Sequence, residues 1–276
     1  MIATFYRYGR LGNRLFTFSN LIAFSELHKV PVAMPAFAEY RKDFPYFNGN
    51  PLCVYGPNGG YLTRIVSALS CGIGAAVGLV PTVRFWDGRR VYFDAEDEKD
   101  SRVQKMIQSR TVLFQGWDFC SRRAIIQFRD RIRSVFSPRT EVIHGAKALR
   151  SQMLERADVL VGVHVRWGDY RGTDRFFELA EYLERMGEIR ALLSPSKPAF
   201  LIFSPEAIPR DALLENNYVC STDPMVDLYS LAECDYLFGP PSTFSMWASY
   251  YGGKPLFIMK SGRKFNELSY AKMATP

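Results

Sequence analysis

The sequence predicts an α/β fold in which parallel strands carry helices on both faces. Short apolar strands alternate with helical segments through the second half of the chain. The 276 residues, 47% of them hydrophobic, suffice to bury one large core or two modest ones. Because ligands of such sheets bind at the carboxyl ends of strands, we expect the chemistry just after each strand.

The first half opens with a predicted buried strand at residues 2–8 and a glycine-bearing loop at 9–13. A wide apolar face then predicts a helix over residues 15–27. Residues 36–64 are rich in Pro, Gly, Asn and Tyr, which is typical of loops.

A second strand is expected at residues 111–117, and an amphipathic helix at 121–136 sets apolar positions against arginines. The helix stops at a Ser-Pro pair, and a domain boundary is expected between residues 137 and 155. We therefore predict two domains, residues 1–145 and 146–276.

In the second half of the chain, predicted strands and helices alternate more regularly. Strands are expected at residues 159–166, 199–204, 217–220, 236–238 and 256–259. Helices are expected at residues 176–187, 224–233 and 244–251, the second with proline in its first turn.

The formal net charge is +7, which suits a phosphorylated substrate, nucleic acid or an anionic membrane surface equally well. The five cysteines are widely spaced without a C-x-x-C pair, and the first residues lack a signal-peptide layout, so we expect a cytoplasmic protein. The basic helix at 121–136 is either a solvated face or a peripheral contact with the inner face of a membrane.

Residues 65–80 form an uncharged apolar stretch, shorter than the roughly 20 residues that span a bilayer. Gly72, Gly74 and Gly78 miss the dinucleotide-binding spacing by one residue. A buried or surface-lying helix is one interpretation, and a helix that touches a membrane or an acceptor is the other.

Several common catalytic sites are excluded by the sequence. Three widely separated histidines rule out an H-E-x-x-H zinc site, and the acidic pair with which many sugar-nucleotide enzymes bind metal is missing. There is no Walker loop and no G-x-S-x-G elbow.

Three polar segments follow predicted strands. In the first, residues 9–16, Gly12 and Asn13 precede a helix whose first turn favours anions, although a simple strand-to-helix turn has the same pattern.

The second segment is His164-Val-Arg166-Trp-Gly-Asp169-Tyr. His164 and Arg166 stand two apart on a strand and therefore face one way. An arginine can bind a diphosphate through two hydrogen bonds. The alternative is an Arg166–Asp169 structural ion pair beside a satisfied histidine.

The third segment, residues 227–247, contains a strand that ends at Phe238 and a loop, residues 239–243, that leads from this strand into a helix. Ser242, Thr243 and Ser245 offer hydroxyl groups at the helix N-terminus, which is again an anion site. Helix capping by Ser242 or Thr243 is the alternative.

Taken together, the three segments resemble the α-1,2-fucosyltransferases. That family shows G-G-L-G-N-Q, then H-x-R-R-G-D-Y, then S-S-F-S-W-W-G-A-W after a D-M-x-x-M-S-x-C helix. Here they read GRLGNR, HVRWGDY and STFSMWASY, with Asp227 heading DLYSLAEC. The order and spacing agree across nearly the whole chain.

The resemblance implies a glycosyltransferase of the GT-B type, with two Rossmann-like domains facing a cleft. It implies inverting transfer of fucose from GDP-fucose to a hydroxyl of an acceptor oligosaccharide or glycolipid, in the α-1,2 linkage of the family, without a metal or other cofactor. The donor would bind the second domain and the acceptor would face the first.

The resemblance also assigns roles to residues. Arg166 would bind the donor pyrophosphate and neutralise the leaving diphosphate. The base that assists the acceptor hydroxyl would be Asp169 or Asp174. Further donor contacts would come from His164, Asp227, Ser242, Thr243, Phe244 and Ser245, and the cleft would be lined by Gly12, Asn13 and Arg14.

Four of the departures from the family pattern bear on the donor sugar and the acceptor. Trp167 replaces the second arginine, and Arg14 replaces a glutamine, so that Arg14 could restore the lost charge. Pro241 and Met246 replace an asparagine and a tryptophan. Alternatives are therefore another donor sugar or linkage, or a non-catalytic nucleotide- or glycan-binding relative. Nucleic acid is not expected as a partner, because the basic residues are dispersed.

Overall fold

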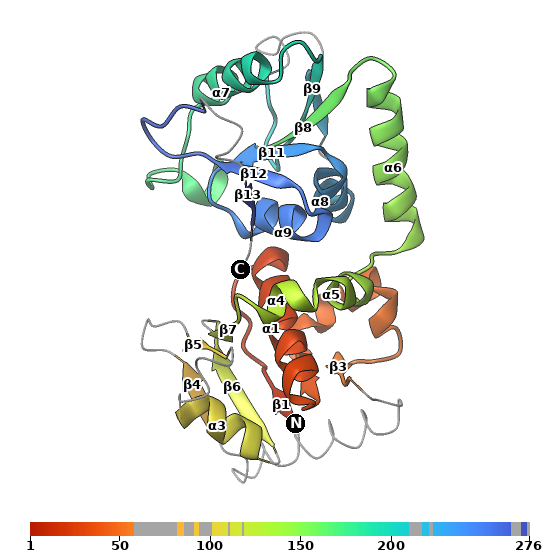
Figure 1. Cartoon of the computed structure of the whole chain (residues 1–276), viewed down its shortest axis with the longest axis vertical. Helices are drawn as coiled ribbons and strands as arrows, with labels where there is room; N and C mark the ends of the chain where they lie inside the picture. Colours follow the sequence, from red (N-terminus) through yellow and green to blue (C-terminus); the bar gives the residue numbers. More distant parts are fainter. Residues whose placement is uncertain are drawn as a thin grey trace. The chain divides into compact units, whose positions relative to one another are not determined.

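The computed structural model describes residues 1–57, 82–85, 91–93, 101–109, 111–117, 119–209, 217–220, 223–265 and 272–274. It divides into two compact units, the first comprising Met1–Pro138 and the second Arg139–Ala274 (Figure 1). The boundary precedes helix α6 (Thr140–Leu154), through which the predicted boundary at residue 145 would cut. A continuously hydrogen-bonded helix belongs to one unit, which is why the division falls at its start.

The first unit contains a five-stranded sheet in the order β3-β2-β1-β6-β4. These strands are β3 (Val54–Tyr55), β2 (Val32–Ala33), β1 (Ile2–Ala3), β6 (Val112–Gly116) and β4 (Thr82–Phe85). All pairs are parallel except β2 with β3. A separate parallel pair joins β5 (Val91–Tyr92) to β7 (Phe119–Cys120).

The helical segments of this unit include α1 (Leu11–His28), α3 (Ser101–Gln108), α4 (Ala124–Gln127) and α5 (Arg129–Val135). Two 3-10 segments, η1 (Pro35–Asp43) and η2 (Pro45–Phe47), follow β2. Buried rings from α1, η1, η2 and the end of α5 pack with centroids 5.2 to 6.0 Å apart. Such ring pairs add to the free energy gained by burying apolar surface.

Three predictions for the first unit are wrong in detail. The strand predicted at 2–8 ends at Ala3, and Phe5 is 49% exposed. The helix begins at Leu11, so the loop predicted at 9–13 already includes its first turn. The helix predicted at 121–136 is interrupted at Phe128, which caps α4 and begins α5.

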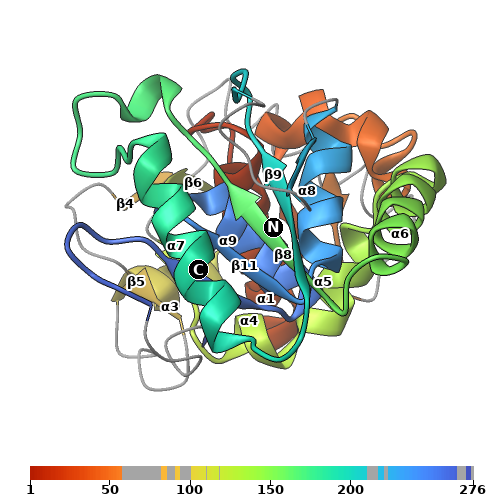
Figure 2. The ribbon, with the colours of Figure 1, turned by 90° about the horizontal axis from the view of Figure 1, so that it is seen from above.

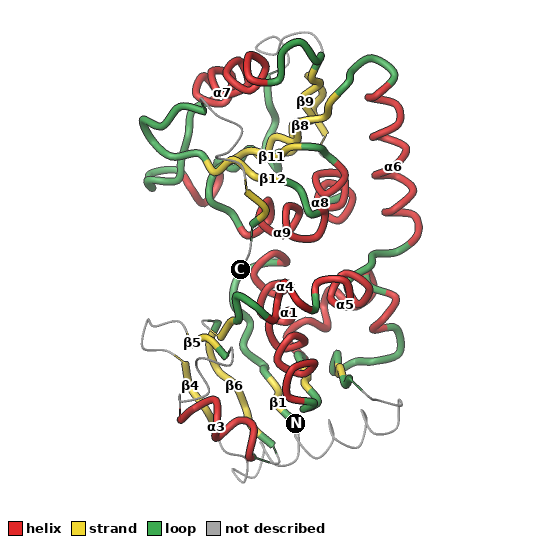
Figure 3. The backbone as a smooth tube through the Cα atoms, viewed as in Figure 1, coloured by secondary structure: helices red, strands yellow, loops and turns green. Residues whose placement is uncertain are grey.

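The second unit contains a six-stranded sheet in the order β10-β9-β8-β11-β12-β13. These strands are β10 (Asn217–Cys220), β9 (Pro198–Phe203), β8 (Val159–His164), β11 (Tyr236–Gly239), β12 (Pro255–Ile258) and β13 (Lys272–Met273). All pairs are parallel except β12 with β13. The predicted parallel α/β fold is thus confirmed, and Figure 3 distinguishes its strands from its helices.

Besides α6, this unit has helices α7 (Leu179–Leu192), α8 (Pro224–Glu233) and α9 (Thr243–Gly252). Local sequence explains where two of them begin. Glu178 and Glu181 form a capping box on α7, and the Asp223 carboxylate accepts a hydrogen bond from the Met225 amide on α8.

Helices cover both faces of the second sheet (Figure 2). Val161 and Val163 of β8 share one buried cluster with Met186 and Ile189 of α7. On the opposite face, a Cβ atom at Gly162 would lie 2.7 Å from Leu231 Cδ2 of α8, so the glycine permits close packing there. Both faces of β8 are therefore buried, which explains its continuous apolar sequence.

Within the described residues, no helix is long and apolar enough to cross a membrane. The apolar stretch predicted at 65–80 lies outside the described residues.

Candidate anion-binding site at the carboxyl edge of the second sheet

The second sheet has a topological switch point between β8 and β11. The chain runs from β8 to β9 and β10 on one side and then returns through α8 to β11 on the other side. At such a point the loops that follow the two central strands diverge and leave a crevice for ligands. The polar residues predicted at 164–169 and 242–245 follow these two strands.

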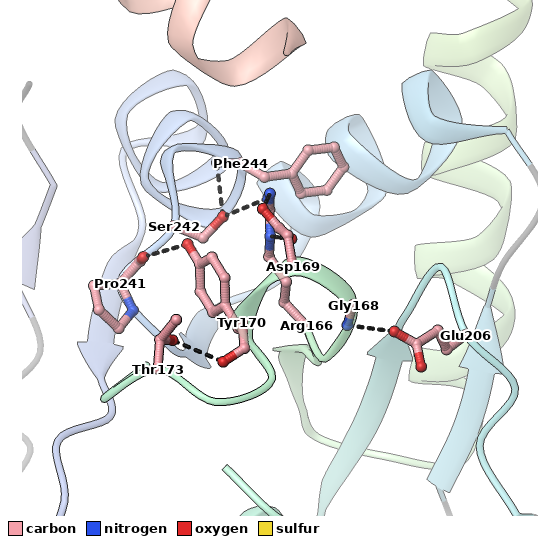
Figure 4. Close-up of polar contacts among 9 residues, drawn as sticks. All are labelled: Arg166, Gly168, Asp169, Tyr170, Thr173, Glu206, Pro241, Ser242 and Phe244. Atoms are coloured by element: carbon pink, nitrogen blue, oxygen red, sulfur yellow. Dashed lines mark hydrogen bonds and ion pairs between the residues drawn. The ribbon is translucent and has the colours of Figure 1, made fainter. Parts of the chain in front are cut away.

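Arg166 lies two residues beyond β8 and forms a bidentate ion pair with Asp169 (Figure 4). Its Nε and Nη2 donate to the two carboxylate oxygens over 3.0 and 2.8 Å. Burial opposes the charge on Arg166, but the bonds to Asp169 and the proximity of Tyr170 outweigh it, so its pKa is raised. The structural ion pair considered from the sequence is present, and it occupies one edge of the guanidinium.

The other edge of the guanidinium lies toward helix α9. Its Nη1 makes a long contact of 3.5 Å with Ser242 Oγ. Ser242 is the N-cap of α9, and its Oγ accepts from the Phe244 amide over 3.3 Å. Ser242 therefore caps α9, as the alternative interpretation of the sequence expected, and its hydroxyl also lies close to Arg166. A guanidinium beside a helix N-terminus forms a region of positive potential suited to an anion.

Tyr170 joins the two loops of the site. Its ring centroid lies 4.8 Å from Arg166 Cζ, and its hydroxyl donates to the Pro241 carbonyl over 2.8 Å. The cation–π contact and the hydrogen bond together hold Arg166 against the loop that leads into α9. Sequence reasoning did not select Tyr170, although it ends the quoted segment HVRWGDY.

His164 ends β8 and is 5% exposed. Its ring centroid lies 5.1 Å from that of Phe244, and its Nδ1 is buried without a hydrogen-bond partner among the described residues. Burial, with a smaller contribution from Arg166, lowers its pKa to about 3, so the imidazole is neutral at pH 7. A buried polar atom without a partner is costly, which makes Nδ1 a candidate ligand contact.

The neutral state of His164 predicts a loss of stability in acid. Its pKa in the unfolded chain is 6.5, so the unfolded state takes up the proton first as the pH falls. Stability is full above about pH 7 and declines toward pH 3. Between pH 7 and pH 4, the wild type should lose about 2–3 kcal/mol more unfolding free energy than His164→Asn.

Urea unfolding at the two pH values measures this difference. His144→Asn is the matched control because His144 is exposed on α6, and it should keep the wild-type pH dependence. An equal loss in His164→Asn and wild type would contradict the prediction.

The structure places the remaining predicted residues of this unit as follows. Thr243 and Ser245 lie in the first turn of α9, where Ser245 Oγ donates to the Ser242 carbonyl over 3.1 Å. Asp174 is exposed on the loop beyond Tyr170. Asp227 lies in the first turn of α8. This helix follows β10, and β9 lies between β10 and β8 in the sheet.

Arg14 has a structural environment within the first unit. Its side chain donates to the Ala36 carbonyl over 2.7 Å and to the Gly9 carbonyl over 3.2 Å, and it forms an ion pair with Glu39. It is 7% exposed, and burial lowers its pKa. Glu39 pairs with this charge locally, and the hypothesis that Arg14 restores a charge for a ligand stays a prediction.

Gly12 and Asn13 lie in the first turn of α1. The Asn13 side chain covers Gly9, where a Cβ atom would lie 1.8 Å from Asn13 Nδ2. Gly9 also has φ +62°, so both its conformation and its surroundings require glycine.

Trp167, which stands where the family shows an arginine, packs against the core of the second unit. Its indole Nε1 donates to the Phe177 carbonyl over 2.9 Å. Glu206 lies beyond β9, accepts a hydrogen bond from the Gly168 amide and pairs with Arg171 at 3.2 Å. Sequence reasoning missed Glu206, although the search beyond each strand end would have reached it.

No protein-family model matches the chain, and no curated protein matches it in sequence. Solved structures do match the chain in fold. A mutant of Arabidopsis thaliana FUT1 in complex with GDP is 12% identical, with a TM-score of 0.58 over 99% of this chain and 75% of that one. POFUT1 in complex with GDP-fucose is 12% identical, with a TM-score of 0.56 over 96% of each chain.

The α-1,6-fucosyltransferase NodZ, from Bradyrhizobium, soaked with GDP-fucose, is 15% identical, with a TM-score of 0.56 over 96% of each chain. At these identities the likeness shows the fold and leaves the activity to the site itself. The chain therefore has the GT-B fold of solved fucosyltransferases.

Proposed function

We propose that this chain is an inverting glycosyltransferase that transfers fucose from GDP-fucose to a hydroxyl of an acceptor glycan, forming an α-1,2 linkage. The observation that carries the proposal is the position of Arg166 Nη1 beside the N-terminus of α9 at the switch point of the second sheet. The similar structures contain GDP or GDP-fucose, which supports the choice of donor. The α-1,2 linkage rests on the sequence motifs alone.

In this proposal the second unit binds the donor. The diphosphate lies between Arg166 Nη1 and the first-turn amides of α9, near Thr243 and Ser245. His164 and Phe244 lie beside the nucleotide, and Asp227 contacts guanine or ribose. The first unit, with Gly12 and Asn13, lies on the acceptor side. Arg166 and the helix N-terminus supply the positive charge that a metal ion would otherwise supply, so no cofactor is required.

The reaction is a single displacement. The acceptor oxygen forms a bond to the anomeric carbon while the bond to the GDP oxygen breaks, and the configuration inverts. The two electrons of the broken bond leave on the diphosphate, where Arg166 and α9 stabilise the charge. A carboxylate takes the proton from the acceptor hydroxyl.

Asp169 and Asp174 are the two candidates for this base. Both Asp169 oxygens already accept hydrogen bonds from Arg166, which favours a positioning role for Asp169. Asp174 is exposed on the same loop, which favours it as the base.

Calorimetric titration in EDTA with GDP, GDP-fucose, UDP and ADP tests the proposal. GDP and GDP-fucose should bind, while UDP and ADP should bind at least about tenfold more weakly, a difference of roughly 1.4 kcal/mol. Binding that requires added magnesium or manganese would contradict the metal-independent mechanism. Absence of binding to any nucleotide would overturn the assignment, and GDP binding without fucose transfer to any acceptor would favour a non-catalytic relative.

A further inference from the structure

An exposed aromatic stack lies on the first unit. Tyr8 and Trp117 are stacked with ring centroids 5.0 Å apart and planes 7° apart. Tyr6 extends the stack, with its centroid 6.2 Å from that of Tyr8 and planes 6° apart. We name Tyr6, Tyr8 and Trp117 the aromatic platform.

The platform lies where a ligand of this sheet is expected. β1 stands between β2 and β6, so the first sheet has its own switch point between β1 and β6. Tyr6 and Tyr8 lie on the segment that leaves the carboxyl end of β1, and Trp117 directly follows β6. Loops at such a point line the ligand crevice of a parallel sheet.

Packing within the first unit leaves Tyr8 and Trp117 exposed, while Tyr6 is half-buried. Trp117 is 45% exposed and Tyr8 36% exposed. Among the described residues, five large hydrophobic side chains are this exposed, and three of them, Phe5, Tyr8 and Trp117, belong to these two segments. Aromatic side chains gathered at one exposed edge mark an interaction site more strongly than scattered ones do.

The chemistry of the platform fits a sugar ring. Aromatic faces carry partial negative charge and attract polarised C–H groups, and a stack of rings leaves its outer faces available to such groups. A pyranose has faces of C–H groups and a rim of hydroxyls, and exposed Arg7 and Arg10 lie on the same segment as possible donors to that rim.

We infer that the aromatic platform binds a pyranose ring of the acceptor glycan. This inference rests on the proposed function, which requires an acceptor glycan. It adds the residues of the first unit that would hold the acceptor, and these lie outside the three sequence motifs.

A printed array of mammalian, plant and bacterial glycans, probed with the full chain in the presence of GDP, tests this inference. The wild type should be retained on a subset of glycans. Tyr8→Ala and Trp117→Ala should weaken retention on that subset by about tenfold, whereas Trp117→Phe should keep most of it because the flat ring remains. Ile126→Ala is the matched control, since Ile126 is 49% exposed on α4 of the same unit, and it should behave as wild type.

GDP titration of the same variants separates the inference about the aromatic platform from the proposed function. Unchanged GDP affinity in Trp117→Ala, with unchanged melting temperature, supports an acceptor site. A protein that binds GDP but is retained on no glycan, or platform variants retained as strongly as wild type, would overturn the inference. Weaker GDP binding in Trp117→Ala would also overturn it, because the rings would then stack on the nucleobase. If the protein bound no GDP but its glycan retention still depended on the aromatic platform, the sugar-binding site would be supported and the proposed function would be overturned.

Discussion

Replacing Arg166 by alanine is expected to lower fucose transfer at least about a thousandfold and to remove most GDP binding. The variant loses the guanidinium that faces the α9 N-terminus, and it leaves Asp169 as an uncompensated negative charge in the anion site. Both changes act most strongly on the charge that develops on the leaving diphosphate. Single-turnover transfer and calorimetry with GDP measure the two effects separately.

Two further variants make this result specific. Arg175→Ala removes an exposed arginine from the same loop and should keep both GDP binding and transfer. Arg166→Lys keeps the charge but loses the planar fork that pairs with Asp169, so it should recover only part of the activity. Near-normal turnover in Arg166→Ala would show that the site lies elsewhere.

Gly239→Ala is expected to lower the unfolding free energy by about 1–3 kcal/mol. A Cβ atom at Gly239 would lie 2.6 Å from the His164 carbonyl oxygen, which is backbone of the central strand β8 and cannot move without disturbing the sheet. GDP binding should weaken as well, because Gly239 ends the strand that leads into the α9 N-terminus. Urea unfolding gives the stability change, and titration gives the change in affinity.

Gly187→Ala is the matched control for this substitution. Gly187 is exposed within α7, and a Cβ atom there meets no other atom within 4 Å. Alanine should raise the unfolding free energy by about 0.5–1 kcal/mol, because it disfavours the unfolded chain and suits a helix. Equal effects of the two substitutions would mean that β8 and β11 do not approach each other closely at Gly239.

The sequence was most informative for the second unit. Strand β10 and helix α8 have the predicted bounds, and the other predicted strands differ by one or two residues at an end. Arg166 and Ser242 could be expected to meet, because each follows a strand and the carboxyl ends of parallel strands share one edge. The ion pair between Arg166 and Asp169 could be offered from the sequence only as an alternative, because the same residues are compatible with an ion pair and with a ligand contact.

The first unit was harder to predict because tertiary contacts override local pattern there. Residues 2–8 look like one apolar strand, but only Ile2 and Ala3 pair with neighbours on both sides. The rings beyond them are exposed, which periodicity alone could not indicate. Arg14 was assigned to a ligand from its place in a motif, and the carbonyl groups and carboxylate around it became visible only in the fold.

The two switch points are built from separate stretches of chain. The first uses residues 2–10 and 112–117, and the second uses residues 159–174 and 236–245. In evolutionary terms, each stretch can accumulate substitutions under its own selection, because neither sheet edge draws its loops from the other sheet. A lineage with this architecture can therefore diversify what one edge recognises while purifying selection preserves the other.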